Sequence, residues 1–431
     1  MTVLGPCMYN RPISQYGVIV LGGGCAGLSL IRKLVQQNFD IPILLLEQRT
    51  QYTHDRTWSG WFSTEQLQGL ETIPKHTYTS WSFTSASKKI LHTSEEHAYC
   101  SIASGDFYTD TLALLEQSPM VDVHLDIALD DIEHLLANKS EQTVLIDTIG
   151  VTQKPHKREV DTRTTYQQSK SRGMSTDCEG LWQRFAGVTV SANQPLFTPD
   201  ELKQAALMHD MQSNEHGFCF NYILPLTQYT ALVETTFFTT EALSAVYLQK
   251  QSIAAAKDFF AANTDVNTAR HHACALTFTV SEEGHLPMQV NPDKSSMAYA
   301  STSGIILGGT IAGALRPSSG YAFASIQNWA KKVAEFLVSE NSQVFEPYQH
   351  YSRITLYLDR IFLAALSRYS TIAPQLFLSM ATTLSAKQFA LFMNHQAGLL
   401  VWLKVIWAMP KRPFMKAWWS IGRKKDTLNA E

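Results

Sequence analysis

Three glycines near the N-terminus have the spacing that lets a polypeptide backbone hold a phosphate group. Gly22, Gly24 and Gly27 follow the apolar run 17–21, which predicts a buried strand, and lead into the helical pattern 26–37. In the spacing G-x-G-x-x-G the first glycine makes the tight turn, the second lets the backbone approach a pyrophosphate, and the third lets helix and strand pack closely. A helix starting at Ala26 would direct free N–H groups and a positive dipole end at that pyrophosphate.

An acidic residue stands at the matching place after the next strand. Glu47 ends the apolar run 41–46. A carboxylate at this place accepts hydrogen bonds from the ribose hydroxyls of an adenosine. We therefore predict a dinucleotide site. The early position of the glycines and the strand-rich region farther along the chain favour FAD over NAD as the resident cofactor.

A second glycine-rich stretch, GGTIAGALRPSSGYAF at 308–323, also leads from an apolar run into a helical pattern. It predicts backbone N–H groups near the phosphates or the isoalloxazine ring of the cofactor. An arginine in this stretch could hold negative charge there. A purely structural glycine–proline turn is the alternative. The expected cofactor contacts are Gly308, Gly309, Gly313, Arg316 and Gly320.

One glutamate stands alone in a strongly apolar stretch. Glu234 lies in LVETTF (232–237) with Leu232, Val233, Phe237 and Phe238 as near neighbours. Desolvation raises the pKa of a carboxyl group and keeps it protonated near neutral pH, so this side chain could serve as a buried acid. Strand alternation alone would equally allow Glu234 to face solvent.

Composition and charge exclude several function classes. The 431 residues carry 35 basic and 38 acidic side chains, a formal net charge of −3, which provides no global field for nucleic acid. The cysteines and histidines show no ligand spacing, so we expect no metal site. The N-terminus lacks the pattern of a signal peptide, and no apolar run is long enough to predict a transmembrane helix.

The order of patterns predicts an α/β fold, α+β overall. We expect a Rossmann-like FAD-binding domain, an inserted antiparallel β domain for the substrate, and a helical C-terminal region. A helix is expected from about Asp106 and another over 321–339. Three strands are expected to form a small hairpin sheet, at 121–126, 142–149 and 157–163.

The expected domains follow the same order. The FAD-binding βαβ segment comes first, then the rest of that domain with its hairpin, then the substrate domain, a return to the FAD-binding domain, and the helical region. Their predicted bounds are 1–75, 76–165, 166–295, 296–345 and 346–431.

Further motifs give the chain a family resemblance. Along the chain they are DRTW (55–58), DTR (161–163), LWQRFAG (181–187), ILPL (223–226), LVETTF (232–237), GHLPM (284–288), RPSSGYAF (316–323), LDRIFL (358–363) and WLKVIWAMPKRPFMKA (402–417). With the glycine fingerprint, this set resembles the flavoprotein lycopene cyclases of carotenoid biosynthesis, the bacterial type related to plant β- and ε-cyclases. Two residues depart from the family pattern. Thr198 replaces an acid, and His209 precedes Asp210, which leaves the role of Asp210 open.

The resemblance implies a lycopene β-cyclase-like isomerase, an intramolecular lyase. It would convert the ψ-ends of lycopene, or of a related acyclic carotenoid, to β-rings, giving β-carotene through γ-carotene. The reaction is redox-neutral, and the family's FAD acts in its reduced form with NAD(P)H as reductant. By the same resemblance Glu234 is the catalytic acid and Asp55 is a further catalytic residue. Asp55 and Arg56 are expected to contact flavin or substrate, and a surface ion pair beside a packed tryptophan is the alternative. One of Glu282 and Glu283 contributes to the site, and Glu283 is the residue we assign.

Two other functions fit the same patterns. One is a redox FAD-dependent hydroxylase of the same fold, and the other is a non-catalytic flavin- or carotenoid-binding protein. A tail rich in tryptophan and basic residues, 399–425, is typical of an interfacial helix. Because a carotenoid sits in the bilayer, we expect a cytoplasmic protein peripherally associated with the cytoplasmic membrane. An amphipathic helix packed on the core is the alternative.

Overall fold

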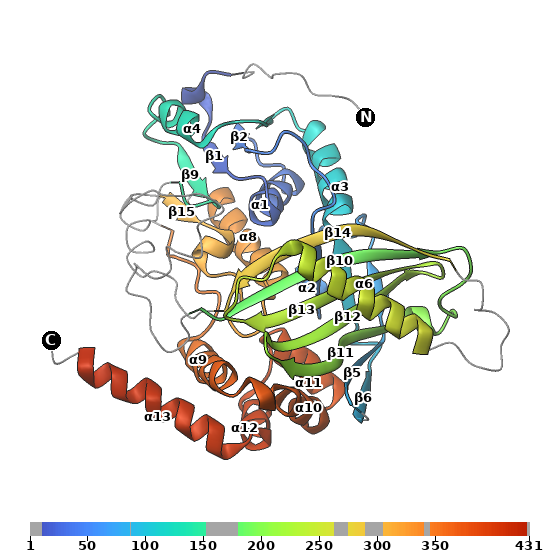
Figure 1. The fold of residues 1–431 in the computed structure, drawn as a ribbon. Coiled ribbons are helices and arrows are strands. Elements are labelled where there is room, and N and C mark those ends of the chain that lie inside the picture. The colour runs from blue at the N-terminus through green and yellow to red at the C-terminus, as the bar shows by residue number, and fades with distance from the viewer. Residues whose placement is uncertain are drawn as a thin grey trace.

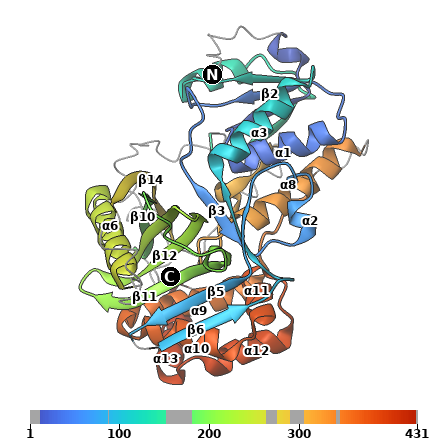
Figure 2. The ribbon, with the colours of Figure 1, turned by 90° about the vertical axis from the view of Figure 1, so that its right-hand side faces the viewer.

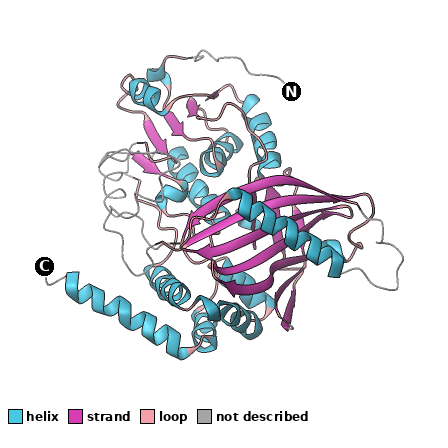
Figure 3. Ribbon diagram, viewed as in Figure 1, coloured by secondary structure: helices cyan, strands magenta, loops and turns pink. Residues whose placement is uncertain are grey.

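The computed structural model describes residues 11–86, 88–151, 180–262, 275–288, 305–339 and 345–428, with side chains up to Ile421. Three sheets and their helices make up this part of the chain (Figure 1, Figure 3). The predicted strand 157–163 lies outside the described residues.

The first sheet is parallel and consists of five short strands in the order β15-β9-β1-β2-β8. Apolar residues fill β1 and β2 because helices cover both faces, as is usual for parallel sheets. Helices α1, α3 and α8 pack on one face and α4 on the other. The bounds are β1 Val18–Leu21, β2 Ile43–Leu46, β8 Val121–His124, β9 Val144–Asp147, β15 Ile305–Leu307, α1 Cys25–Gln36, α3 Ser104–Glu116, α4 Leu129–Leu136 and α8 Phe323–Val338.

The second sheet has seven strands in the order β14-β10-β13-β12-β11-β5-β6, and all neighbours except β11 and β5 are antiparallel. The strands are β5 Ser80–Ser85, β6 Lys88–Thr93, β10 Trp182–Ala192, β11 Gln204–Asn214, β12 Gly217–Thr227, β13 Thr230–Thr239 and β14 Leu276–Pro287. Helix α6 (Ala245–Ala262) covers one face, and its packing forms a separate apolar cluster.

The opposite face of this sheet packs on the C-terminal helices, and together they form the largest apolar cluster (Figure 2). Phe218 stacks on Phe377 there, with ring centroids 5.1 Å apart. The sheet is therefore a layer between α6 and five helices. Those helices are α9 Arg353–Arg368, α10 Ala373–Thr383, α11 Ala386–Met393, α12 Leu399–Ala408 and α13 Lys411–Leu428.

A small third sheet is formed by strands that lie between β2 and β8 along the chain, and β5 and β6 of the second sheet fall between its strands β4 and β7. Its strands are β3 (Thr57–Gly60), β7 (Tyr99–Ala103) and β4 (His76–Tyr78), with β7 in the middle. The short helix α2 (Thr64–Leu67) follows β3 and begins with a capping box, in which Ser63 and Gln66 satisfy each other's backbone N–H groups.

The Rossmann-like core, the antiparallel sheet and the helical C-terminal region are confirmed. The predicted hairpin is wrong, because β8 and β9 run parallel in the first sheet with β1 and β2 between them. Short apolar strands carry no signal that reveals their partners. In addition, β5 and β6 lie within the predicted FAD-binding segment 76–165 but join the second sheet.

Within the described residues, no single helix is long and apolar enough to cross a membrane. The bent pair Arg353–Arg368 and Ser370–Thr383 satisfies the length and composition test only when the two are taken together.

Candidate active site

The glycine turn lies at the carboxyl end of β1, where open parallel sheets bind their ligands. Gly22 has a φ of +96°, which favours glycine, and its amide donates to the carbonyl of Leu46 at the end of β2. A Cβ on Gly27 would lie 2.0 Å from the carbonyl oxygen of Gly22, so only a glycine lets α1 pack this closely. A Cβ on Gly24 would meet no atom within 4 Å. Gly24 therefore faces open space.

Glu47 is buried beside this turn. Its side chain accepts hydrogen bonds from the amides of Gly23 and Arg49, the second at 2.8 Å. Gly309 approaches from β15 with a φ of +70°, and its Cβ would lie 3.2 Å from the Cβ of Ala26. Three strand ends thus converge on one place, as the two glycine-rich stretches predict.

One cavity of about 820 Å³ joins this turn to the second sheet. At the end formed by the turn it is lined by Gly24, Ala26, Glu47 and Gly309, and at the other by Tyr222, Glu234, Glu282 and Tyr321. Trp58, Phe185 and Phe323 add aromatic walls. The cavity therefore spans from a phosphate-binding turn to a pair of carboxyl groups.

The residues on this cavity fit a dinucleotide. The open space at Gly24 leaves room for a pyrophosphate against the backbone. Gln183 Oε1 and Ser319 Oγ are buried on the cavity wall, and neither has a hydrogen-bond partner among the described residues. Buried polar atoms of this kind ordinarily have partners, so these two are free to bind a ligand.

Two carboxyl groups meet at the other end of the cavity. Glu234 on β13 and Glu282 on β14 are both cross-strand partners of Gly187 on β10. The Thr236 hydroxyl donates to Glu234 Oε1 over 2.7 Å, and a hydrogen bond joins the two glutamates. Burial raises the pKa of Glu234 to about 7, and burial together with the charge of Glu234 raises the pKa of Glu282 well above its ordinary value. Both groups therefore hold protons more firmly than ordinary carboxyls do.

Three tyrosines stand beside the carboxyl pair. Tyr222 is the cross-strand neighbour of Glu234 on β12, and it hydrogen-bonds with Tyr321. The hydroxyls of Tyr321 and Tyr99 are 3.4 Å apart. Burial raises the pKa of all three phenols, so they stay neutral.

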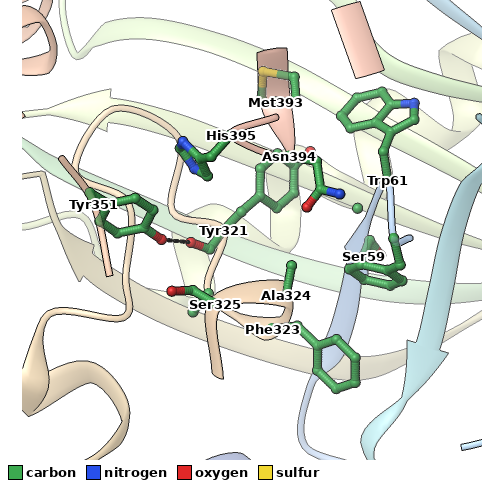
Figure 4. Close-up of a pocket in the computed structure, with 13 residues that line it drawn as sticks. Ser59, Trp61, Tyr321, Phe323, Ala324, Ser325, Tyr351, Met393, Asn394 and His395 are labelled. Atoms are coloured by element: carbon green, nitrogen blue, oxygen red, sulfur yellow. Dashed lines mark hydrogen bonds between the residues drawn. The ribbon is translucent and has the colours of Figure 1, made fainter. Parts of the chain in front are cut away.

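Tyr351 contacts the backbone of the loop that carries Tyr321. Figure 4 shows the small pocket there, in which the hydroxyl of Tyr351 points at the backbone carbonyl of Tyr321, 3.5 Å away. The same hydroxyl donates to the carbonyl of Ala314 over 2.6 Å. Tyr351, just before α9, thus holds both ends of the segment 314–321 of the second glycine-rich stretch.

A comparison with protein families identifies the relatives of this fold. The family model described as lycopene cyclase protein matches residues 17–413. The chain belongs to the lycopene cyclase family. No curated protein matches it.

Solved structures similar to this lycopene cyclase family member are distant. A geranylgeranyl bacteriochlorophyll reductase-like protein from Thermoplasma acidophilum has 12% identity and a TM-score of 0.46, over 94% of this chain and 99% of that one. The p-nitrophenol 4-monooxygenase PnpA from Pseudomonas putida has 12% identity and a TM-score of 0.46, over 93% and 98%.

Several of the predicted cofactor contacts line the cavity of this lycopene cyclase family chain, and others support the cavity wall. Gly308 does not line it, because its Cβ position faces the ring of Trp329, and Gly313 ends the 3-10 turn Gly309–Ala312 with a φ of +86°. Gly22 and Gly27 shape the turn itself. The predicted contacts that line the cavity are Gly24, Ala26, Glu47, Arg56, Gly309 and Gly320.

Arg316 is directed away from the cavity, which corrects its predicted role. Its side chain is only 2% exposed, and Nε and Nη2 donate to the two carboxylate oxygens of Asp359 over 3.2 and 3.3 Å. Nη1 donates to the carbonyl of Phe392. The guanidinium therefore connects the glycine-rich loop to α9 and α11. Sequence reasoning could not detect this partner because Asp359 lies far along the chain.

Asp55 lies beside the dinucleotide end of the cavity rather than beside Glu234. Its Oδ1 accepts hydrogen bonds from Ser104 and Tyr108, and Oδ2 is 3.6 Å from Arg49. Arg56 is exposed and lines the cavity. The positions of both fit contact with a cofactor better than proton transfer at the carboxyl pair.

The structure places Glu282, not Glu283, beside Glu234. Glu283 lines the cavity, but its side chain is exposed and accepts a hydrogen bond from Gln249. A β-bulge in β14 shifts the register by one residue opposite Gly187 and Val188, so alternation could not identify the inward glutamate. Asp210 is exposed on β11 and does not line the cavity.

Proposed function

We propose that this chain is an FAD-dependent carotenoid cyclase that closes the ψ-ends of lycopene, or of a related acyclic carotenoid, into β-rings. The observation that carries the proposal is one cavity that joins a glycine turn suited to a dinucleotide to a pair of carboxyl groups, whose pKa values burial raises. Acid-catalysed ring closure needs a proton donor next to apolar substrate and away from water. Family membership supports the same reaction.

The chemistry begins with Glu234 as general acid. Its O–H bond breaks, a C–H bond forms at C2 of the terminal double bond, and C1 becomes cationic. Attack by the C5=C6 bond closes the ring, and loss of the proton on C6 gives the β-ring. The carboxylate left at Glu234 accepts that proton, so the site returns to its initial state with no net oxidation.

Aromatic side chains on the cavity wall would stabilise positive charge. Trp58, Phe185, Tyr222 and Tyr321 present aromatic rings, whose faces attract a cation. Because all the neighbouring phenols are neutral, none is poised to trap the cation as a phenolate. A substrate that fills the apolar and aromatic part of the cavity would keep water from the cationic intermediate.

The cofactor we propose is FAD, held by the Gly22–Gly27 turn, by Glu47 at the ribose and by Gly309 and Gly320 along its length. Bound in its reduced form, with NAD(P)H as reductant, it would supply negative charge that stabilises the developing cation. Gln183 and Ser319 offer the unpaired polar atoms that would fix its orientation.

A membrane surface is the proposed source of the substrate. Large apolar side chains are exposed along one face of α12 and continue onto α13, with Trp407 and Trp419 77% and 66% exposed. Exposed basic residues, among them Lys404, Lys411 and Lys416, lie among them. Aromatic and basic side chains combined in this way suit the headgroup region of an anionic bilayer. We therefore propose that the protein is cytoplasmic and peripherally bound to the cytoplasmic membrane.

Expression in a lycopene-accumulating cell tests the function. The expected result is a loss of lycopene with appearance of γ-carotene and β-carotene. Purified holoprotein should consume NAD(P)H once per flavin and not once per ring, which distinguishes a cyclase from a hydroxylase. Unchanged lycopene in the presence of folded, FAD-containing protein would contradict the proposal.

A further inference from the structure

Gly187 sits between the two glutamates of the pair. Glu234 and Glu282 are its cross-strand partners on either side, so their backbones are two strand spacings apart, about 10 Å. A Cβ on Gly187 would lie 2.8 Å from Cγ and 3.1 Å from Oε1 of Glu282. The missing side chain therefore leaves the space through which Glu282 reaches across the strand toward Glu234.

The bulge in β14 gives Glu282 this direction. The register shifts between Gly187 and Val188, where Ser281 is the extra residue. Bulges of this kind redirect a side chain next to a functional site. Val280 is 50% exposed and Glu282 is 6% exposed. A glycine and a bulge, on adjacent strands, thus serve one purpose.

The two carboxyl groups have unequal surroundings. Both line the cavity, but Glu282 is only 6% exposed and hydrogen-bonds with Thr57 of β3, whereas Glu234 is partly exposed and accepts a hydrogen bond from Thr236. Two carboxyl groups in contact in a poorly solvated place do not both ionise near neutral pH. The more deeply buried Glu282 keeps its proton, and the hydrogen bond between them lowers the pKa of Glu234.

We propose that Glu282 is a positioning residue that stays neutral and donates a hydrogen bond to Glu234, stabilising the carboxylate formed when Glu234 gives up its proton. This inference rests on the proposed function. In each cycle Glu234 loses its proton to the substrate carbon and regains one from the ring, while Glu282 keeps its own. Glu282 thereby makes a buried carboxyl group a stronger acid and fixes its orientation.

Other ionisable groups near the pair come from several elements. Tyr222 on β12 and Tyr321 before α8 interact electrostatically with Glu234. Elsewhere on the cavity wall the charged or titratable groups include Arg56, Arg184, Glu283 and His285. Wild type and the Glu282 variants share all of these groups. A difference between their pH profiles therefore reports on Glu282.

The first test compares two substitutions of Glu282. Glu282→Gln keeps a neutral side chain with an N–H donor, and it should retain activity with an unchanged alkaline limb in the pH profile. Glu282→Leu removes the donor, and kcat should fall by ~10- to 100-fold, the effect of losing one hydrogen bond to a charged group. Its alkaline limb should move to higher pH, while KM and FAD content stay near wild type.

Three outcomes would overturn the assignment. If Glu282→Gln is as inactive as Glu234→Gln while binding FAD, Glu282 transfers the proton itself. If Glu282→Leu keeps the wild-type rate and pH profile, the hydrogen bond has no role. Glu283→Gln tests the neighbouring glutamate. If the alkaline limb shifts in Glu283→Gln and does not shift in Glu282→Leu, the assignment of Glu282 is also refuted. The exposed Glu215→Gln is the matched control.

A spectroscopic measurement tests the pair without reference to turnover. Infrared titration of wild type should reveal one carboxyl group that stays protonated at pH values above the pKa of Glu234, about 7, and Glu282→Gln should lack it. Absence of that signal in wild type would refute a neutral Glu282. If the signal is present but the enzyme forms no ring, the proposed function fails and the protonated pair stands.

Discussion

At the scale of single residues, the burial of Glu234 sets the pH range in which the site can act. Burial raises its pKa to about 7, so the acid form predominates below that value and is lost as pH rises through it. The rate of ring formation should therefore fall as pH rises through about 7.

Glu234→Gln should abolish ring formation and leave FAD bound. Product analysis by chromatography checks this, and residual cyclisation in that variant would rule Glu234 out as the acid.

The same raised pKa predicts a change in stability. A carboxyl group whose pKa is higher in the folded state binds more protons there, so stability falls as pH rises between the unfolded and folded pKa values. Above about pH 7 this loss of stability is complete in wild type. Glu234→Gln does not, and should unfold at a higher urea concentration than wild type at pH 8. Equal midpoints at pH 8 would argue against a desolvated carboxylate at this position.

Gly187 offers a prediction that depends on space alone. Gly187→Ala would place a Cβ 2.8 Å from Cγ of Glu282 and force that side chain to move. The expected result is a loss of activity of at least ~10-fold, with FAD content and fold retained, because the hydrogen bond to Glu234 is broken. Steady-state kinetics and circular dichroism measure these effects. Wild-type turnover in the variant would show that Glu282 need not occupy this space.

At the scale of helices and strands, local patterns could be predicted and distant pairings could not. The glycine turn, β1, α1, β2 and α8 follow from apolar periodicity and glycine spacing within short segments. The partners of β8 and β9 are set by strands elsewhere in the chain. The choice of Glu282 over Glu283 depends on a bulge, and the burial of Arg316 depends on Asp359. These contacts leave no mark in the neighbouring sequence.

The turn before α1 gives a prediction at this scale. Gly24→Ala adds a methyl group that meets no protein atom within 4 Å, so the fold should be kept. The methyl group lies on the cavity where a pyrophosphate would approach the backbone, so bound FAD should fall at least ~10-fold. Flavin absorbance of the purified protein measures this. Gly398→Ala, also free of neighbours within 4 Å, is the control and should keep its flavin. Full occupancy in Gly24→Ala would place the cofactor elsewhere.

At the scale of the whole molecule, the exposed apolar face of α12 predicts where the protein meets lipid. Leu400 and Trp407 are 76% and 77% exposed on that face. Replacing both with Asp should reduce binding to anionic vesicles by at least ~10-fold, since burial of large apolar side chains drives such binding. Vesicle flotation measures it. Val246→Asp, an exposed apolar position on α6, is the control. Unchanged flotation of the double variant would exclude this face.

The order in which strands enter the two large sheets bears on how the protein is made. The seven-stranded sheet takes its β5–β6 edge from residues 80–93, yet its opposite edge strand, β14, is synthesised only after residue 275. The parallel sheet begins with β1, and its last strand in the chain is β15. Helix α8, which covers one face of this sheet, ends at Val338. Neither sheet can close on the ribosome before most of the chain has emerged. Because such long-range pairings form slowly, nascent chains should depend on chaperones. Fragments that lack the later strands of either sheet should not fold.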